Sequence, residues 1–297
     1  MRRSGLPWLA ALVVMAGSAA AQTVVHNDER LAHDRPEAWA MNDVAASTFM
    51  TAFGATPLLA PGRWQGALEL TAIPRLSAEE QRVGLGGFKE EDLDRSPVFG
   101  RGRLQVGLPA GWVAEVAYTP PIEIAGTHPR ELFDVALAHR VIARDGFTLS
   151  ARLVGQHGFV GGDITCPARL AGIADPARNP SGCVAASDDR LRVDYYGGDA
   201  TLGRDLGAWH WHATLGVLRT ELAVQVNAHV FDQIDRSRLV ARDVLPYVAL
   251  GVSNDVDPHW NLGAEVLYVP LTVRRDVNGP RADDSFVTLR VAARFRP

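Results

Sequence analysis

Two histidines, His210 and His212, are the residues best suited to metal chemistry, because they stand two positions apart in an alternating segment. Alternate residues of a strand project to the same face, so both imidazoles can point the same way, as metal ligands on strands do. The sequence offers no recognisable third ligand. We therefore expect no metal site and no cofactor, and we interpret both side chains as hydrogen-bonding groups in a polar interior.

A hydrolytic site is the second chemistry that the residue types allow. Ser150, His139 and His157 could supply a nucleophile and its base, but Ser150 and His139 belong to different predicted strands. The Gly-x-Ser-x-Gly turn that presents a nucleophilic serine in α/β-hydrolases does not occur in the sequence. An enzyme is therefore not the expectation, and a lipid hydrolase is kept only as an alternative.

The two cysteines, Cys166 and Cys183, lie in a segment rich in Gly, Pro, Asn and Ser. An even number of cysteines in an exported protein favours a disulfide. A metal site would need more ligands than this segment has, since no histidine lies between the cysteines and only Asp163 and Asp175 are near. We predict a disulfide that closes a surface loop.

The N-terminus has the three regions of a secretory signal. Arg2 and Arg3 precede an apolar run over residues 6–15, and the small residues 19–21 follow, which predicts a signal peptide over residues 1–21. The apolar run is shorter than the roughly 20 residues that a spanning helix needs. Beyond residue 22 no stretch reaches that length without charge or proline, so a membrane span would have to be built from strands.

The composition narrows the class of protein further. A net charge of -4 is too small to indicate a nucleic-acid partner. An apolar content of 47% is that of an ordinary soluble protein and excludes a helical membrane protein. A membrane barrel remains possible, because its strands alternate and need not be hydrophobic on average.

The last residues of the chain show such alternation most clearly. From residue 285 onward, one face carries Val287, Leu289, Val291, Ala293 and Phe295, and the other carries Thr288, Arg290, Ala292 and Arg294. An unbroken apolar face backed by arginines suits a wall between lipid and a polar lumen.

Nine further segments alternate in the same way and give about ten strands in total. The connections between them alternate as well: those at 109–111, 144–146, 204–207 and 254–258 are short, and those at 75–97, 121–131, 159–190, 229–238 and 274–284 are long. If both chain ends are periplasmic, every short turn is periplasmic, which is the known asymmetry of bacterial barrels. Within residues 191–204 the outward parity of the apolar residues changes, which predicts a β-bulge.

The C-terminal pattern resembles the closing strand of Gram-negative outer-membrane β-barrels, which usually end in an aromatic residue; here Phe295 is followed by Arg296 and Pro297. The resemblance implies an all-β fold, a transmembrane antiparallel up-and-down β-barrel of about ten strands within a range of roughly eight to twelve. It also implies residence in the cell outer membrane, lipid as a partner, and recognition of the C-terminal strand by the barrel-assembly machinery.

The chain then divides into the signal peptide, an N-terminal helical or irregular segment over residues 22–62, and the barrel over residues 63–297. Residues 28–53 are predicted to be helical or irregular and not strand-like, with Pro36 early in a helix. The apolar part of this segment is superficially similar to the N-terminal plug of outer-membrane long-chain fatty-acid transporters. We therefore consider it a possible plug of the lumen.

The polar face of the strands predicts the residues that line the lumen. They are Glu69, Arg103, Gln105, Glu115, Asp134, Arg140, Arg152, His210, His212, Glu265 and Arg290, together with Gln65 and Arg294. Opposite charges inside a narrow barrel should pair across the lumen, because an unpaired buried charge is costly. This set fits either a constricted polar channel or an ion-paired core that only stabilises the barrel.

The architecture favours a porin-like channel or transporter for an unknown small or amphipathic solute. The alternative from another class is a structural or adhesive surface protein that acts through its extracellular loops.

Overall fold

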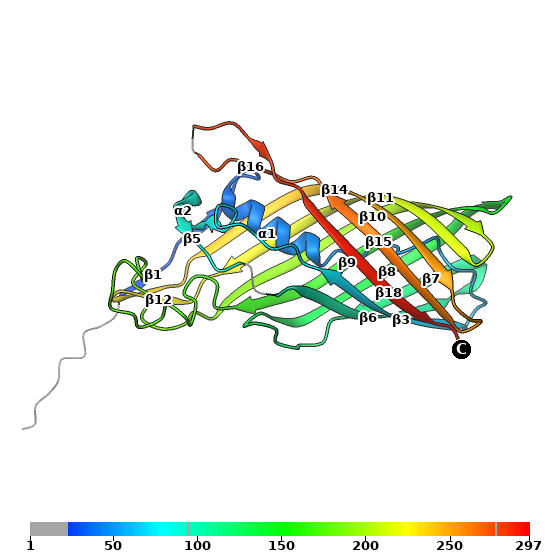
Figure 1. Cartoon of the computed structure of the whole chain (residues 1–297), viewed down its shortest axis with the longest axis horizontal. Helices are drawn as coiled ribbons and strands as arrows, with labels where there is room; N and C mark the ends of the chain where they lie inside the picture. Colours follow the sequence, from blue (N-terminus) through cyan, green and yellow to red (C-terminus); the bar gives the residue numbers. More distant parts are fainter. Residues whose placement is uncertain (1–22, 94–95, 277) are drawn as a thin grey trace, which may run out of the picture.

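The computed structural model describes residues 23–93, 96–276 and 278–297. The expected signal peptide lies outside these residues. The described chain forms one closed antiparallel barrel of ten strands, with a helix inside one end (Figure 1). The barrel strands are β3 (Trp64–Ala72), β6 (Val98–Gly107), β7 (Trp112–Tyr118), β8 (His128–Arg144), β9 (Phe147–Gly162), β10 (Asp189–Leu206), β11 (Trp209–Gln225), β14 (Arg238–Asp255), β15 (Trp260–Val269) and β18 (Phe286–Phe295).

Each barrel strand pairs with the strands that precede and follow it in the chain, and β18 pairs with β3 to close the cylinder. The predicted up-and-down barrel is therefore confirmed, and so is the strand number. Closure gives every barrel strand a neighbour on both sides and leaves no edge strand, which is the condition for crossing a membrane with strands.

The outer surface is apolar over the middle of the wall. Large side chains at alternate positions are widely exposed, among them Leu68, Leu153, Leu215, Leu250 and Leu289, each more than half exposed. A soluble monomer rarely exposes a continuous apolar belt of this kind, whereas lipid requires one. Trp112, Tyr118, Trp209, Trp260 and Tyr268 are exposed on the same outer surface, as aromatic residues at membrane interfaces are.

The two ends of the barrel differ in their connections. One end, which we call the short-turn end, carries the tight turns between β6 and β7, β8 and β9, β10 and β11, and β14 and β15, together with the C-terminus. The other, the long-loop end, carries the longer connections. The condition that both chain ends lie on one side is not met by the described chain, because the strand β1 (Thr23–Val25) pairs with β13 (Gln233–Asp235) at the long-loop end.

The wall is uneven in height. Strands β8 to β11 and β14 contain 16 to 18 residues, whereas β3, β6, β7, β15 and β18 contain 7 to 10. A tilted strand needs only about 9–11 residues to cross a bilayer. The taller wall is therefore longer than one bilayer crossing requires, and Figure 1 shows β10, β11 and β14 running on beside α1 toward the long-loop end.

The helix α1 (Pro36–Ser47) begins with proline at its first turn, where the missing N–H removes no helical hydrogen bond. Its residues are buried on nearly every side, since it lies inside the barrel and contacts β10, β11, β14 and β18. The expected helix is present, but residues 28–30 form the strand β2 (Asp28–Arg30), parallel to the start of β14. Our prediction that this stretch is not strand-like is thus wrong, because the tall wall offers β14 as a pairing edge.

The remaining elements belong to the long connections and to one tight turn. They are α2 (Gly84–Gly87), the 3-10 turn η1 (Pro109–Gly111), and the short strands β4 (Arg82–Val83), β5 (Lys89–Glu90), β12 (Ala228–Val230), β16 (Thr272–Val273) and β17 (Ala282–Asp283). No helix in the described ranges is long and apolar enough to cross a membrane.

The bulge predicted in β10 is absent, since β10 pairs with β9 and β11 in constant register. Val193 and Tyr195 face inward like Asp199 and Thr201, and all four are buried. The apparent change of parity arises because the inner face itself changes from polar to apolar along the strand. The irregularities lie in β8 instead, between Arg130 and Phe133 and between Arg140 and Ile142.

Candidate functional site

The interior of the barrel contains two zones of opposite polarity. Toward the long-loop end, α1 packs in an apolar zone; toward the middle and the short-turn end, residues 48–59 run through a polar zone. The apolar zone is formed by Trp39, Met41, Phe49, Met50, Leu191, Val193, Tyr195, Leu218, Leu222, Ala241, Leu245, Tyr247, Leu267, Val269 and Phe286. A helix buried all round needs such a lining, since it presents few polar groups.

In the polar zone, arginines from the wall hold the backbone of residues 48–56. Arg101 donates to the carbonyls of Thr48 at 2.9 Å and Phe49 at 2.8 Å, and Arg152 donates to Met50 at 2.5 Å. Buried carbonyls that have left the helix need donors, and guanidinium groups supply several from one side chain.

The same pattern continues along the next residues of the segment. Arg103 donates to the carbonyl of Thr51 at 2.7 Å, and Arg294 donates to that of Phe53. Arg140 reaches the carbonyl of Thr56 at 2.9 Å. Five arginines from four strands thus bind one extended segment through its main chain.

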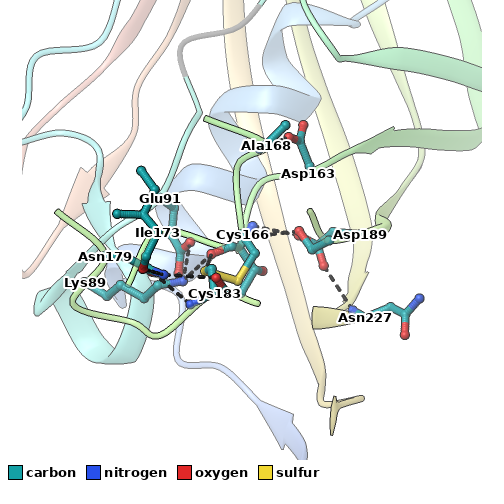
Figure 2. Close-up of a disulfide and its surroundings, with 12 residues drawn as sticks. Lys89, Glu91, Asp163, Cys166, Ala168, Ile173, Asn179, Cys183, Asp189 and Asn227 are labelled. Atoms are coloured by element: carbon teal, nitrogen blue, oxygen red, sulfur yellow. Dashed lines mark hydrogen bonds and ion pairs between the residues drawn. A yellow bond between two sulfur atoms is a disulfide. The ribbon is translucent and has the colours of Figure 1, made fainter. Parts of the chain in front are cut away.

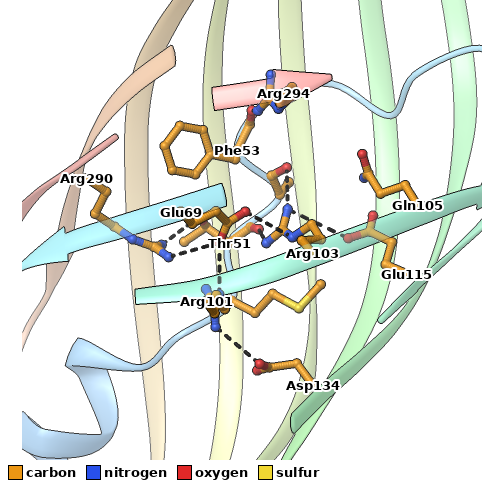
Figure 3. Close-up of polar contacts among 12 residues, drawn as sticks. Thr51, Phe53, Glu69, Arg101, Arg103, Gln105, Glu115, Asp134, Arg290 and Arg294 are labelled. Carbon is orange, nitrogen blue, oxygen red and sulfur yellow. Dashed lines mark hydrogen bonds and ion pairs between the residues drawn. The ribbon is translucent and has the colours of Figure 1, made fainter. Parts of the chain in front are cut away.

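Carboxylates on the wall neutralise most of these arginines (Figure 3). Glu69 lies 2.8 Å from Arg101 and 3.0 Å from Arg103, and Arg101 also contacts Asp134 at 3.3 Å. Glu115 lies 3.7 Å from Arg103. These five side chains are each at most 5% exposed, so the pairing offsets a large desolvation cost.

Two further clusters extend the polar zone around the barrel. Arg290 pairs with Glu265 at 3.0 Å, and His212 contacts the other oxygen of Glu265 at 3.1 Å. Arg152 pairs with Asp199 at 2.6 Å. The network therefore involves strands on all sides of the lumen, and the segment in its centre bonds to several of them.

Of the residues predicted to line the lumen, nine lie buried inside the barrel: Glu69, Arg103, Gln105, Glu115, Asp134, Arg152, His212, Glu265 and Arg290. Arg140 and His210 are only partly buried and lie near the short-turn end. Gln65 is buried and donates to Gln105, while Arg294 also contacts Asn261 at 3.1 Å.

The residues considered for metal or hydrolytic chemistry lie in separate places. His210 sits between Asp205 at 2.7 Å and Asp255 at 2.9 Å, away from the Glu265 partner of His212. No group of three potential metal ligands occurs within the described ranges. Ser150 is buried and accepts a hydrogen bond from the Thr56 N–H.

The two histidines proposed as partners for Ser150 do not approach it. His139 is cross-strand partner to Ala151, not Ser150, and its ring stacks on that of Trp112 on the outer surface. His157 contacts Asp194 at 3.0 Å. The Ser–His arrangement of a hydrolase is not assembled by these three residues.

Sequence reasoning missed four members of the polar zone: Arg101, Asp199, Tyr195 and Tyr247. Arg101 shares the inward parity of Arg103, so alternation alone could have identified it. The tyrosine hydroxyls donate to the Asp134 and Asp199 carboxylates at 2.8 Å and 2.6 Å. Their rings belong to the apolar zone, which hid their inward orientation in the sequence.

A cavity of about 350 Å³ lies beside α1 at the long-loop end. Its lining includes inward residues such as Glu69 and Arg101 and outward residues such as Leu68 and Leu70. Because the lining includes side chains from both faces of the wall, the cavity connects the region around the helix with the outer surface. We call it the side cavity.

The strand pairing explains the opening. The ladder between β6 and β7 ends at the pair Gly102 and Tyr118, whereas β6 continues to Val98 along β3. Pro120 and Pro121 follow β7 and have no N–H to extend the ladder. On the outward face of β6, Gly102 leaves space that a side chain would fill, since a Cβ there would meet nothing within 4 Å.

A second cavity, of about 270 Å³, lies at the short-turn end below the polar zone. The extended segment forms part of its lining, together with Arg140, His210, His212, Arg294 and Arg296. The polar zone therefore lies between two cavities that open toward opposite ends of the barrel.

The predicted disulfide between Cys166 and Cys183 is present and ties the loop after β9 (Figure 2). Lys89, the single lysine of the chain, contacts Glu91 at 2.9 Å and donates to the Thr165 carbonyl at 2.7 Å. Burial raises the pKa of Glu91 to about 7 although Lys89 opposes the shift. The loops after β3 and β9 are thus joined at the long-loop end.

Among proteins of known structure, several β-barrels are similar to this chain. The outer-membrane protease OmpT of Escherichia coli is 11% identical over 79% of this chain and 92% of its own, with a TM-score of 0.38. A FadL homologue of Pseudomonas aeruginosa is 15% identical over 80% and 73%, with a TM-score of 0.33. The toluene transporter TodX of Pseudomonas putida is 13% identical over 93% and 78%, with a TM-score of 0.33.

No family model matches the chain, and no curated protein matches it. The assignment follows from the closed barrel and its apolar outer belt, which the lipid of a membrane requires. The chain is a membrane-spanning β-barrel protein.

Proposed function

We propose that this barrel transports small amphipathic solutes through the side cavity. The observation that carries the proposal is the apolar cavity beside α1, whose lining includes both faces of the wall. A solute of mixed polarity could leave the water at the long-loop end, enter this cavity and reach the membrane between β6 and β8. Apolar pockets with a few polar groups are the usual form of small-molecule sites.

We also propose that residues 36–60 act as a plug. In support, arginines from β6, β8, β9 and β18 bind the carbonyls of residues 48–56, and ion pairs surround the segment. A small barrel leaves little bore even before a segment fills it. Ions should therefore pass poorly along the barrel axis, and the side cavity is the route with an apolar lining.

A variant can test the route. Gly102→Phe would place a ring in the side cavity, where a Cβ meets no atom within 4 Å. Gly155→Phe is the matched control, because Gly155 lies on β9 away from the cavity lining and a Cβ there makes only ordinary contacts at 3.5 Å and beyond. Uptake of radiolabelled octylamine, octanol and octanoate is measured in cells that express each variant.

We expect the parent chain to increase the uptake of at least one solute over cells with an empty vector. Gly102→Phe should lower that increase about tenfold, and Gly155→Phe should leave it unchanged, since only the first blocks the cavity. Equal uptake with and without the protein would refute transport. Large single-channel conductance in planar bilayers would instead refute the plug.

A surface-binding role is the second candidate, and one observation favours it. The loops on the taller wall are tied to each other through the disulfide, through Lys89 and through the Arg169–Asp92 pair at 3.3 Å. Rigid loops beyond the membrane suit adhesion. Deleting residues 167–182 would abolish cell binding in that case and spare solute uptake.

Assembly of the barrel is a separate proposal. We propose that β18, the closing strand with Phe295 near its end, is recognised by the barrel-assembly machinery, as the resemblance of this strand implies. Phe295→Ala should then lower the amount of folded protein in the outer membrane.

A further inference from the structure

The side cavity is not uniformly apolar. Most of its surface is aliphatic or aromatic, with Val44, Leu68, Leu70, Ile73, Leu76, Leu93, Phe99, Ile122, Ile124, Val160, Ile164 and Leu191 in the lining. Two polar groups of residues in this lining, the Asp43 carboxyl and the Thr119 hydroxyl, have no hydrogen-bond or ion-pair partner among the described residues.

Asp43 lies on α1 and is partly buried. No group among the described residues makes a hydrogen bond or an ion pair with its carboxyl, whereas the neighbouring Asn42 on the same helix contacts Asp243 at 3.3 Å. Burial raises the pKa of Asp43 to about 7, and the charges of Asp284 and Glu80 raise it further in the same direction. Such a group gains most from a cationic partner.

Thr119 follows β7 at the point where the β6–β7 ladder has ended. Its backbone N–H bonds to the Leu132 carbonyl, but its hydroxyl has no partner in the described chain and the residue is only 4% exposed. Buried hydroxyls are normally hydrogen-bonded, and this one, on a residue that lines the cavity, is an exception among the described residues.

The charges around the cavity disfavour an anionic solute. Arg101 is the cation in its lining, and its donors already bind Glu69, Asp134 and the carbonyls of Thr48 and Phe49. These bonds use four of its five N–H donors, so a carboxylate would find at most one guanidinium donor free. A primary ammonium, in contrast, has three donors for the acceptors that Asp43 and Thr119 present.

We propose that the side cavity selects an amphipathic amine, whose ammonium group binds Asp43 and Thr119 while its hydrocarbon part lies among the aliphatic side chains. This inference rests on the proposed transport function and names its substrate class. It predicts discrimination by head group at constant chain length, since the apolar contacts are shared by all solutes of one length.

The test is calorimetric titration of the full barrel in lipid nanodiscs with octylamine, octanol and octanoate, with empty nanodiscs as the baseline. Octylamine should bind at least about tenfold more tightly than the other two solutes. Asp43→Asn should remove this preference, and Thr119→Val should lower the affinity for octylamine about threefold. Asp232→Asn, which removes an exposed carboxylate at the same end, should change nothing.

A pH series on the unmodified protein provides a readout that does not depend on any variant folding. The affinity for octylamine should fall as the pH is lowered from about 8 to about 6, because the Asp43 carboxyl becomes protonated. The other charged groups that face this site are Glu69, Glu80, Asp92, Arg101, Arg275 and Asp284. The affinity for octanol should stay constant over the same range.

The outcomes separate the two proposals. Octanoate binding as tightly as octylamine, or an unchanged preference in Asp43→Asn, would overturn the amine assignment and leave transport standing. Failure of all three solutes to bind, with no effect of Gly102→Phe on uptake, would overturn the transport proposal itself.

Discussion

The apolar zone and the polar zone of the lumen hold the same N-terminal segment by different means. Around α1, the wall supplies buried aliphatic and aromatic side chains, and the helix satisfies its own backbone. Around residues 48–56 the chain is extended, so the wall must supply donors, and arginines do so. The difference shows that backbone conformation decides which side chains a lumen must carry.

The two zones also differ in the effect of removing one wall side chain from each. Loss of an apolar contact leaves a void, whereas loss of an arginine leaves buried carboxylates and carbonyls with fewer partners. A substitution in the polar zone should therefore lower the free energy of unfolding more than one in the apolar zone, although apolar burial is the more general source of stability.

The largest effect is expected for Arg101→Leu, which would remove the guanidinium that pairs with Asp134, one of the partners of Glu69 and the arginine donors of two carbonyls. Leaving a buried charge unpaired costs roughly 3–5 kcal/mol. Urea unfolding in detergent micelles, followed by the gel shift of the heat-denatured form, measures the change. Arg242→Leu is the control, because Arg242 is half-exposed and its oxygen partner on Glu221 lies 4.0 Å away.

The next effect is expected for Phe49→Ala in the apolar zone. Phe49 is fully buried and its ring contacts those of Tyr195 and Tyr247 at centroid distances of 5.2 Å and 6.0 Å. Removing a buried phenyl ring costs about 3 kcal/mol. The same unfolding measurement applies, and a loss larger than that of Arg101→Leu would contradict the ranking of the two zones.

The smallest of the three effects is expected for Tyr195→Phe, at the boundary between the zones. The hydroxyl donates to Asp134 and accepts from the Met50 N–H at 2.8 Å, while the ring packs in the apolar zone. Losing these hydrogen bonds costs about 1–3 kcal/mol. If the variant were as stable as the parent, the two zones would be energetically independent at this point.

Much of the fold followed from alternation. The outward apolar positions in β7, β8, β11, β15 and β18 agree with the sequence pattern, because lipid accepts only apolar side chains over the height of the bilayer. The alternation of short turns and long loops also predicted the strand order, in which consecutive strands are neighbours in the barrel. The disulfide also followed, since compartment and cysteine number decide it.

Within the candidate site, the sequence indicated which residues face inward but not what they bind. Glu69, Arg103 and Arg290 lie inside as their parity predicts, yet Glu69 contacts both Arg103 on the next barrel strand and Arg290 on the last one. We wrongly expected Val193 and Tyr195 to face outward. That expectation took the lumen to be polar throughout, whereas a helix packs inside it and requires apolar neighbours.

The sequence by itself determined that strands cross the membrane, since every one of them has one face that water would not stabilise. Only the tertiary structure decided where residues 36–60 lie, which carbonyls the arginines bind and where the wall opens beside β6. These depend on contacts between residues far apart in sequence, in one case 241 positions, whose geometry is set by barrel closure and not by any local pattern.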